Sequence, residues 1–429
     1  MISREPEVIK GAGVLHKIPE MLKSSGQMQK SGPKQQSTST SVLVATTPGF
    51  IRRGTLESFF EELRQAGIAV TVFSEVVPDP TIECVEAMVT KYVLGNCQAF
   101  VAIGGGSVID CAKAAAARIA CPGKQIRDMK GLLKIHTKLP DFYAVPTTAG
   151  TGSEATAASV VTDTVNGSHY KYAISDPCLI PKYAVLDPEL AIDLPPHITA
   201  ATGMDALTHA VEAYTNKYPS KLVREMALNS VKLIYENLPV AFALEPWVMD
   251  EAALKARENM LLASYEAGVA FTNNFVGYVH AVAHGVGALY GIPHGQANAI
   301  ILPYVLEQFG DAAVKPLAEL ADAAGLTKNV EMKKEAELTR GVDTTKRERL
   351  TEADERKLAA EFIDSIRRMN EAFGIPARIE ELKEEDFETL IDRAIAEANY
   401  TYPVPQIWGR EEFRNLLKKL TRPADRNNI

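Results

Sequence analysis

The first half of the chain alternates short apolar runs with amphipathic stretches, and this alternation restricts the fold more than any other feature. The apolar runs are rich in β-branched residues and include residues 41–46, 68–73, 99–103 and 142–146. Such runs are typical of strands buried on both faces, whereas the stretches between them have helical periodicity. Strand–helix–strand units of this kind build a parallel sheet covered by helices. The sequence therefore predicts an N-terminal α/β domain.

The pattern changes after Leu194-Pro-Pro196. From Ile198 to about Leu420 the periodicity is helical and apolar β-branched runs are few. A chain of 429 residues also exceeds what one compact core usually holds. We expect an α/β domain over residues 1–195 and an all-helical domain over residues 196–429.

Composition excludes several classes of protein. The net charge of -8 and the lack of a basic stripe argue against a nucleic-acid partner. No apolar run reaches the length of about 18 residues that a membrane span needs, and the N-terminus lacks the apolar region of a signal peptide. The five cysteines show no CxxC spacing, which favours reduced thiols. We expect a cytoplasmic protein.

Two loops have the composition of phosphate-binding turns. A glycine-rich turn between a buried strand and a helix offers backbone N–H groups and a helix dipole to a phosphate. By itself, either loop could equally be a tight turn or a helix cap. In an open parallel sheet, loops at the carboxyl ends of neighbouring strands meet over one crevice. The first loop contributes Gly104, Gly105, Gly106, Ser107 and Asp110, and the second Thr147, Thr148, Thr151 and Ser153.

Local signals place three helix starts. Asp79 is expected to cap a helix that has Pro80 in its first turn, and Ser107 to cap the helix after the glycine-rich turn. A further helix is expected over residues 54–66.

Five polar side chains in the second half have the spacing of a metal site. Asp205 and His209 are four residues apart on an expected helix, as are His280 and His284, and His294 follows a turn. A single histidine is more often a hydrogen-bonded core residue, but helical spacing on two separate segments favours a shared role. Three imidazoles and one carboxylate suit a first-row divalent ion. One of the four histidines is then expected to stand near the substrate without binding the metal.

The chain closely resembles the iron-containing (group III) alcohol dehydrogenases in four motifs: GGGSVIDCAK, PTTAGTGSEAT, GMDALTHAVEAY and GYVHAVAHGVGALYGIPHGQANA. The resemblance extends from Glu7 to about Leu420. It implies a Rossmann-like dinucleotide-binding domain followed by an all-α domain, the layout of the dehydroquinate synthase-like superfold. It also implies an active site between the domains and assembly as a homodimer or higher homo-oligomer.

The resemblance assigns roles to individual residues. It implies that the metal is Fe(II), with zinc as an alternative, and that its ligands are Asp205, His209, His280 and His294. It leaves His284 as a catalytic residue close to the nicotinamide and the substrate, and it implies that Phe271 and Ala158 line the substrate pocket. The cofactor, NAD or NADP, is expected to contact Thr47, Asp79, Gly104, Gly105, Gly106, Ser107, Asp110, Thr147, Thr148, Thr151, Ser153 and Lys171.

The sequence departs from the family in three places. Where NAD-preferring members commonly have an aspartate that repels a 2′-phosphate, this chain has Thr47, with Arg52 and Arg53 nearby. Use of NADP, or of both cofactors, is therefore open. The polar segment 27–40 and the charged segment 330–357 resemble insertions.

These features predict an oxidoreductase that moves a hydride between a primary alcohol or aldehyde and NAD(P). The metal would act as a Lewis acid on the alcohol oxygen, and His284 would relay the proton to solvent. The alternatives are a metal-dependent polyol (glycerol-type) dehydrogenase, a cyclising lyase of the same superfold, or a non-catalytic metal- or nucleotide-binding sensor.

Overall fold

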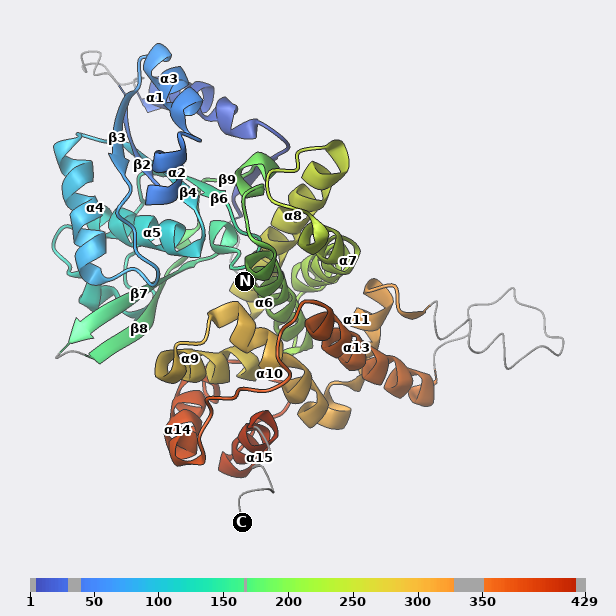
Figure 1. Ribbon diagram of the computed structural model, residues 1–429. Coiled ribbons are helices and arrows are strands. Elements are labelled where there is room, and N and C mark those ends of the chain that lie inside the picture. Colours follow the sequence, from blue (N-terminus) through green and yellow to red (C-terminus); the bar gives the residue numbers. More distant parts are fainter. Residues whose placement is uncertain (1–4, 30–39, 166–167, 328–350, 422–429) are drawn as a thin grey trace. The chain divides into compact units, whose positions relative to one another are not determined.

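The computed structural model describes residues 5–29, 40–165, 168–327 and 351–421. The chain forms two compact units, one of Met1–Leu194 with Glu245–Thr272 and the other of Pro195–Leu244 with Asn273–Ile429. Figure 1 shows the elements of both units in sequence colours. Most of the two expected insertions lies outside the described residues: residues 30–39 of the segment 27–40, and residues 330–350 of the segment 330–357.

The first unit is built on a six-stranded parallel sheet with the order β1-β9-β6-β4-β2-β3 (Figure 1). Every residue of the interior strand β2 is buried, with Val42 and Val44 in one core cluster and Leu43 and Ala45 in another. This double burial explains the continuous apolar runs and confirms the predicted α/β architecture. The strands are β1 (Glu7–Lys10), β2 (Ser41–Ala45), β3 (Ala69–Phe73), β4 (Ala99–Gly104), β6 (Asp141–Pro146) and β9 (Tyr183–Leu186).

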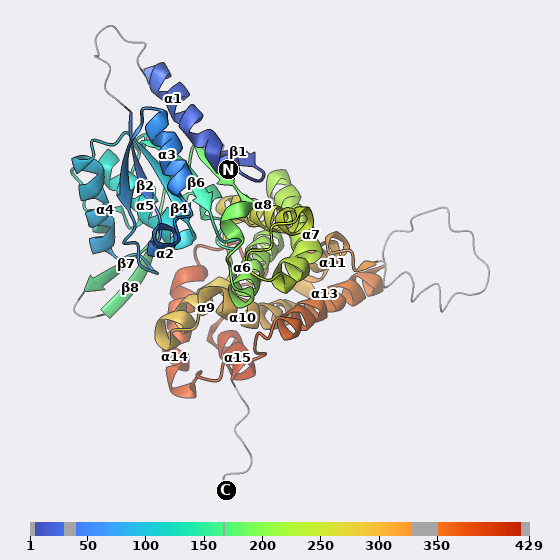
Figure 2. The same ribbon diagram turned by 45° about the horizontal axis from the view of Figure 1, so that its top comes forward.

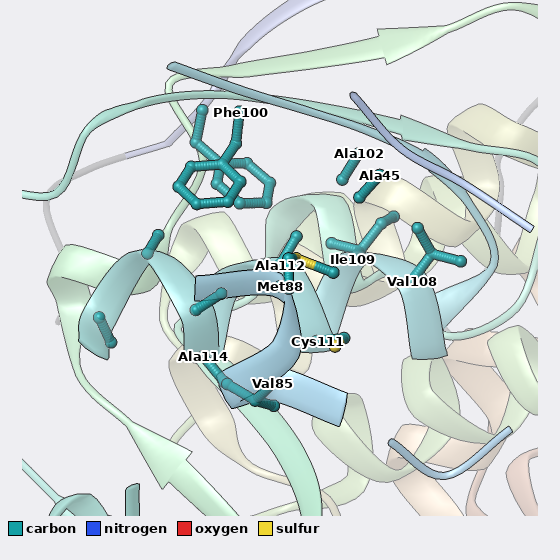
Figure 3. Close-up of a cluster of buried hydrophobic side chains, with 14 of the residues drawn as sticks. Ala45, Val85, Met88, Phe100, Ala102, Val108, Ile109, Cys111, Ala112 and Ala114 are labelled. Atoms are coloured by element: carbon teal, nitrogen blue, oxygen red, sulfur yellow. The ribbon is translucent and has the colours of Figure 1, made fainter. Parts of the chain in front are cut away.

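Helices cover both faces of this sheet. On the face of Leu43 and Ala45 lie α4 (Ile82–Leu94) and α5 (Gly106–Ala120), and Figure 3 shows their side chains packed with those of β2 and β4. The other face is covered by α1 (Ile18–Gln29), α2 (Pro48–Arg53) and α3 (Glu57–Gln65). A second, smaller sheet has the order β5-β8-β7, formed by β5 (Gly131–Leu132), β7 (Ala158–Val165) and β8 (Ser168–Ser175).

The described part of the second unit is helical. In it, α10 packs against both α6 and α9, and α13 packs against α11 (Figure 2). The helices are α6 (Pro196–Thr215), α7 (Lys221–Ala243), α9 (Tyr278–Tyr290), α10 (His294–Phe309), α11 (Val314–Ala323), α13 (Glu352–Ala372), α14 (Phe387–Ala398) and α15 (Arg410–Leu420). Among the described residues, no helix combines the length and the apolar character that crossing a membrane requires.

Helix α8 (Glu251–Asn274) belongs mainly to the first unit, although we expected residues 196–429 to form a single domain. Two glycines bring it close to the second loop: a Cβ on Gly152 would lie 2.7 Å from the Cα of Gly268. The Gly152 N–H also donates to Ser264 Oγ, at 3.1 Å. Helical periodicity reports which face of α8 is buried, but not which unit it is buried against.

Two of the expected helix caps are wrong. Helix α4 is capped by Thr81, whose Oγ1 accepts a hydrogen bond from the N–H of Cys84, while Asp79 lies before it with a φ of 53°. Helix α5 is capped by Gly105, so that Ser107 lies inside its first turn.

The helix expected over residues 54–66 is α3 (Glu57–Gln65), and a separate short helix, α2 (Pro48–Arg53), precedes it. Gly54 has a φ of 68° and ends α2, because only a residue without a Cβ adopts that conformation without strain. The sequence analysis did not predict α2, which has Pro48 as its first residue.

Candidate functional site

Four of the five expected metal-binding side chains converge within the second unit. Asp205 and His209 lie on α6, His280 on α9, and His294 is the first residue of α10. One potential ligand atom from each of the four lies within 4.8 Å of the other three. Asp205, His209 and His280 are buried, whereas the side chain of His294 is 41% exposed. The cluster is therefore accessible from one side.

Three of these groups each have one potential ligand atom close to the same amide nitrogen. Asn298 Nδ2 lies 2.7 Å from Asp205 Oδ1 and 3.1 Å from Nε2 of both His280 and His294. An amide nitrogen has only two hydrogens and cannot satisfy three acceptors at once. The donor set of nitrogen and oxygen atoms, with more lone pairs than hydrogens, fits a divalent cation.

Glu212 fixes the orientation of His280. Its carboxylate accepts hydrogen bonds from the N–H groups of Gly277 and Val279 at 2.8 and 2.7 Å, and lies 2.6 Å from His280 Nδ1. When Glu212 is ionised, Nδ1 carries the hydrogen toward the carboxylate and Nε2 presents its lone pair to the cluster, although burial raises the pKa of Glu212 to about 8. Burial lowers the pKa of His280 well below its ordinary value, which keeps the ring neutral, as ligation requires.

Two glycines allow the helices to approach closely enough for this geometry. A Cβ on Gly295 would lie 2.3 Å from the carbonyl oxygen of Ala201, so a side chain there would push α10 away from α6. A Cβ on Gly277 would lie 2.8 Å from Glu212 Oε1. Both glycines are part of the motifs that drew attention to the site, and packing explains their presence.

His284 lies next to the cluster but is not among its four donors. Its ring stacks on that of His294, with centroids 5.2 Å apart and planes at 11°. Its Nδ1 lies 2.9 Å from Glu397 Oε1, which also accepts a hydrogen bond from the hydroxyl of Tyr402 at 2.8 Å. Although burial opposes it, the charge of His284 and these hydrogen bonds lower the pKa of Glu397. The carboxylate therefore holds the His284 ring by its Nδ1.

The sequence reasoning missed four residues of this site: Glu212, Asn298, Glu397 and Tyr402. Glu212 and Asn298 could have been found, because each is a polar residue on an apolar helix one turn from an expected ligand, and each lies inside a quoted motif. Glu397 and Tyr402 lie more than 100 residues away from His284 in the chain, so no local signal connects them to it.

The two glycine- and threonine-rich loops meet in the first unit. A Cβ on Gly105 would lie 3.3 Å from Thr148 Oγ1, and one on Gly106 would lie 2.7 Å from Thr151 Cγ2. The N–H of Thr147 donates to the carbonyl of Gly104, at 3.1 Å. The absence of side chains on the first loop thus allows the second to pack directly against it, at the N-terminus of α5. This fits a nucleotide phosphate, which approaches backbone N–H groups.

A buried charge network holds the second loop. Lys113 is fully buried, and its Nζ donates to the carbonyls of Ser153 and Thr156 at 2.5 and 2.8 Å, as well as to the Thr156 hydroxyl. Asp110 accepts hydrogen bonds from the Ser153 hydroxyl and the Val160 N–H. Burial lowers the pKa of Lys113 to about 8. The structure therefore directs Asp110 and Ser153 toward each other.

Three more of the expected cofactor residues form a short chain of contacts. Lys171 Nζ pairs with Asp79 Oδ2 at 2.7 Å, and the Asp79 N–H lies 3.4 Å from Ser107 Oγ. Thr47 is elsewhere, as the residue before α2, and its side chain makes no capping hydrogen bond. Arg53, near Thr47 in sequence, pairs with Asp193 at 2.5 Å.

The two residues expected to line a substrate pocket both belong to the first unit. Phe271 is a half-buried residue of α8, and Ala158 begins β7. The Ala158 carbonyl accepts a hydrogen bond from Lys113 Nζ, at 3.0 Å.

Comparison with known proteins gives consistent matches along the chain. Residues 6–188 match the model of the family described as iron-containing alcohol dehydrogenase, and residues 199–421 match that of the Fe-containing alcohol dehydrogenase family, C-terminal. The chain is 33% identical over 403 residues to an NAD-dependent methanol dehydrogenase of Bacillus methanolicus, covering 93% of this chain and 97% of that protein. It is 37% identical over 381 residues to a 1,3-propanediol dehydrogenase of Citrobacter freundii, covering 88% of this chain and 90% of the relative.

A solved structure agrees with these matches. The crystal structure of a 1,3-propanediol oxidoreductase superposes with a TM-score of 0.81 and 31% identity, over 97% of this chain and 98% of that one.

Proposed function

Since the chain belongs to the iron-containing alcohol dehydrogenase family and is an oxidoreductase, we propose that it transfers a hydride between a primary alcohol or its aldehyde and NAD or NADP. The observation that carries the proposal is the cluster of four potential metal ligands in the second unit, three of which lie within 3.1 Å of a single amide nitrogen. The residues that would hold a divalent metal, Fe(II) in this proposal with zinc as the alternative, are Asp205, His209, His280 and His294.

The bound metal would supply Lewis acidity to an alcohol or carbonyl oxygen, and the nicotinamide would supply or accept the hydride. The nucleotide would lie against the loops of the first unit, with its phosphates at the N-terminus of α5. Asp110 and Ser153 would position the second loop through their mutual hydrogen bond. The residues in contact with the nucleotide would be Thr47, Asp79, Gly104, Gly105, Gly106, Ser107, Thr147, Thr148, Thr151 and Lys171.

His284 is the residue that moves the proton in this proposal. Because its Nδ1 donates to Glu397, its Nε2 carries the lone pair and accepts the proton that leaves the alcohol hydroxyl. The side chain of His284 is 46% exposed, so the proton can pass to solvent. Tyr402 secures the carboxylate from the other side and keeps the imidazole in one orientation.

The test is nicotinamide absorbance at 340 nm on Fe(II)-loaded protein, with NADH and NADPH supplied separately. The alcohol panel includes methanol and 1,3-propanediol, because those substrates appear in the names of two relatives, and glycerol, because it distinguishes the polyol dehydrogenase. Turnover that requires the metal supports the proposal. Binding of nucleotide and metal without turnover on any substrate would instead identify a sensor.

We also propose that the protein is cytoplasmic and forms a homodimer or higher homo-oligomer. The free thiols of all five cysteines support a reducing compartment. Sedimentation of the metal-loaded protein measures the assembly state directly, and a monomer at micromolar concentration would contradict it.

A further inference from the structure

Two cysteine sulfurs lie close together in the first unit, outside the residues proposed to act in the reaction. Cys84 is in the first turn of α4 and Cys111 is on α5, and their Sγ atoms are 3.8 Å apart. Figure 3 shows Cys111 within the cluster of buried side chains that joins these two helices. A disulfide needs about 2.0 Å between the sulfurs, so each side chain must move by only about 1 Å.

The two thiols differ in exposure and in acidity. Cys84 is half-buried, whereas Cys111 is fully buried. The hydrogen bond from Cys111 lowers the pKa of the Cys84 thiol to about 7, while the same hydrogen bond and burial raise that of Cys111. A thiol with a pKa near the ambient pH is the better nucleophile in exchange reactions. Cys84 is therefore suited to react first and Cys111 to resolve the product.

We propose that Cys84 and Cys111 form an oxidation site, at which a hydroperoxide converts the two thiols into an intramolecular disulfide. The Cys84 thiolate attacks the peroxide; an S–O bond forms, the O–O bond breaks, and hydroxide leaves. The Cys111 sulfur then attacks the Cys84 sulfenic acid; the S–S bond forms, the S–O bond breaks, and water leaves with the Cys111 proton. The two sulfurs lose two electrons, and hydrogen peroxide becomes two water molecules.

The other three cysteines have different surroundings. Cys97 Sγ lies 3.6 Å from Ser41 Oγ, and Cys121 Sγ donates to the carbonyl of Ile135 at 3.5 Å. Burial raises the pKa of Cys178 to about 12, so little of it is thiolate at neutral pH. The chain thus supplies its own control cysteine for this chemistry.

The experiment treats full-length, zinc-loaded protein with a small excess of hydrogen peroxide, because zinc does not take part in redox chemistry. Intact mass spectrometry is expected to show the loss of two hydrogen atoms, and non-reducing peptide mapping to show the peptides of Cys84 and Cys111 joined. Before oxidation, iodoacetamide is expected to label Cys84 faster than any other cysteine. Dithiothreitol should restore both thiols.

Three variants sharpen the result. In Cys111→Ser, Cys84 is expected to accumulate as a sulfenic acid that dimedone traps, and in Cys84→Ser the loss of hydrogens should disappear. Cys178→Ser should behave as the unmodified protein. A different cysteine pairing, or irreversible oxidation of Cys84 while Cys111 stays free, overturns the proposal. Peptide mapping of the unmodified protein decides this even if a variant does not fold.

The disulfide would act on the proposed nucleotide loops, and this consequence rests on the proposed function. Cys84 is three residues after the cap of α4 and Cys111 is one turn beyond the start of α5, where Ser107 contacts the Asp79 N–H. If the helices also move together as the sulfurs close from 3.8 Å to about 2.0 Å, that contact is displaced. If one phosphate hydrogen bond is lost, affinity for the nucleotide falls roughly fivefold.

Fluorescence titration with NADH and NADPH compares the reduced and oxidised proteins, with peroxide-treated Cys111→Ser as control. Equal nucleotide affinity in the reduced and oxidised proteins would contradict an effect of the disulfide on nucleotide binding, but it would not contradict the oxidation site itself. If neither form binds either nucleotide, the proposed cofactor site fails, and the mass measurement still decides the disulfide.

Discussion

The two candidate sites of this protein are built from different materials. The cluster in the second unit is made by side chains of α6, α9 and α10, each directed at a common point. The paired loops of the first unit are made by backbone, with glycines at Gly105 and Gly106 allowing threonines to pack against them. The identity of a side chain can be read from the sequence, whereas the packing that exposes a backbone surface cannot. The first kind of site should therefore fail when one side chain is removed, and the second when one is added.

Removal of His280 is expected to have the largest effect. Without this imidazole the cluster loses one of three nitrogen ligands, and Glu212 loses the ring it orients. We expect His280→Ala to lose bound metal and to reduce turnover about a thousandfold or more, since the metal supplies several kcal/mol to the reaction. Metal content after dialysis and the rate at 340 nm measure this, and far-ultraviolet circular dichroism should remain unchanged.

The matched control is His16→Ala. His16 is an exposed residue that pairs with Glu62 in the first unit, so metal content and rate should not change. A His280→Ala protein that keeps its metal and its rate would remove the assignment of this side chain as a ligand.

The second-largest effect is expected from a change at Glu212, the carboxylate that contacts His280. A glutamine at position 212 would place its side-chain NH₂ where a carboxylate oxygen now accepts a hydrogen bond. It could not accept the hydrogens of Gly277, Val279 and His280 together. Loss of such support commonly weakens metal binding 10- to 100-fold, and we expect about that for Glu212→Gln. Competition with a zinc chelator measures the affinity; Glu236→Gln, an exposed change on α7, is the control. Unchanged affinity would make Glu212 a purely structural residue.

The contrast between side-chain and backbone sites also explains which parts of the candidate sites could be predicted from the sequence. Helical spacing alone placed Asp205 with His209 and His280 with His284 on shared faces, and it left one histidine over. The structure adds that His284 stands beside the cluster and is held by Glu397, a residue of α14. That contact depends on how two distant helices pack, and no local pattern encodes it.

For the fold, the apolar runs predicted the strands of the parallel sheet because burial on both faces leaves a continuous signature. The N-caps and the ends of the helices were predicted less well. Thr81 and Asp79 have similar capping propensities, so the choice between them depends on a backbone angle that composition does not report. Helix α8 was placed in the wrong half because its partners, such as Gly152, lie about 100 residues earlier in the chain.

An added methyl group should distinguish the loops of the first unit from the metal cluster. The φ of Gly105 is -73°, which alanine adopts, and the nearest atoms to its Cβ belong to the side chain of Thr148 at 3.3 and 3.5 Å. We expect Gly105→Ala to fold normally but to bind NADH or NADPH about tenfold more weakly, because the methyl group would press on Thr148, a proposed nucleotide contact beside the N-terminus of α5.

Isothermal titration of the nucleotide and thermal unfolding measure the two effects separately. Gly123→Ala is the control, since a Cβ there meets no atom of the described chain within 4 Å. Unchanged nucleotide affinity in Gly105→Ala would mean that the glycines serve packing alone. Metal content should be normal in either case, which sets this change apart from those in the second unit.

The smallest effect is expected from a change at Glu154, a buried carboxylate of the first unit that we compare with Glu212 of the second. Glu212 has backbone N–H donors on both oxygens, whereas Oε1 of Glu154 has no hydrogen-bond partner among the described residues. Burial raises the pKa of Glu212 to about 8 and, opposed only in part by a backbone hydrogen bond and by Lys113, raises the pKa of Glu154 from 4.5 to about 7. The folded protein then holds the Glu154 proton more tightly than the unfolded chain does, so the contribution to stability is complete below about pH 4.5 and is lost as the pH rises through about 7.

Glu154→Gln removes this titration while keeping the shape of the side chain. Relative to the variant, the free energy of unfolding of the original protein should fall by about 1 to 3 kcal/mol between pH 5 and pH 8. Urea unfolding at both pH values measures the difference, and Lys113 contributes little because its own pKa of about 8 lies at the edge of the window and it is present in both proteins. A difference that does not change with pH would show that Glu154 stays ionised between pH 5 and pH 8.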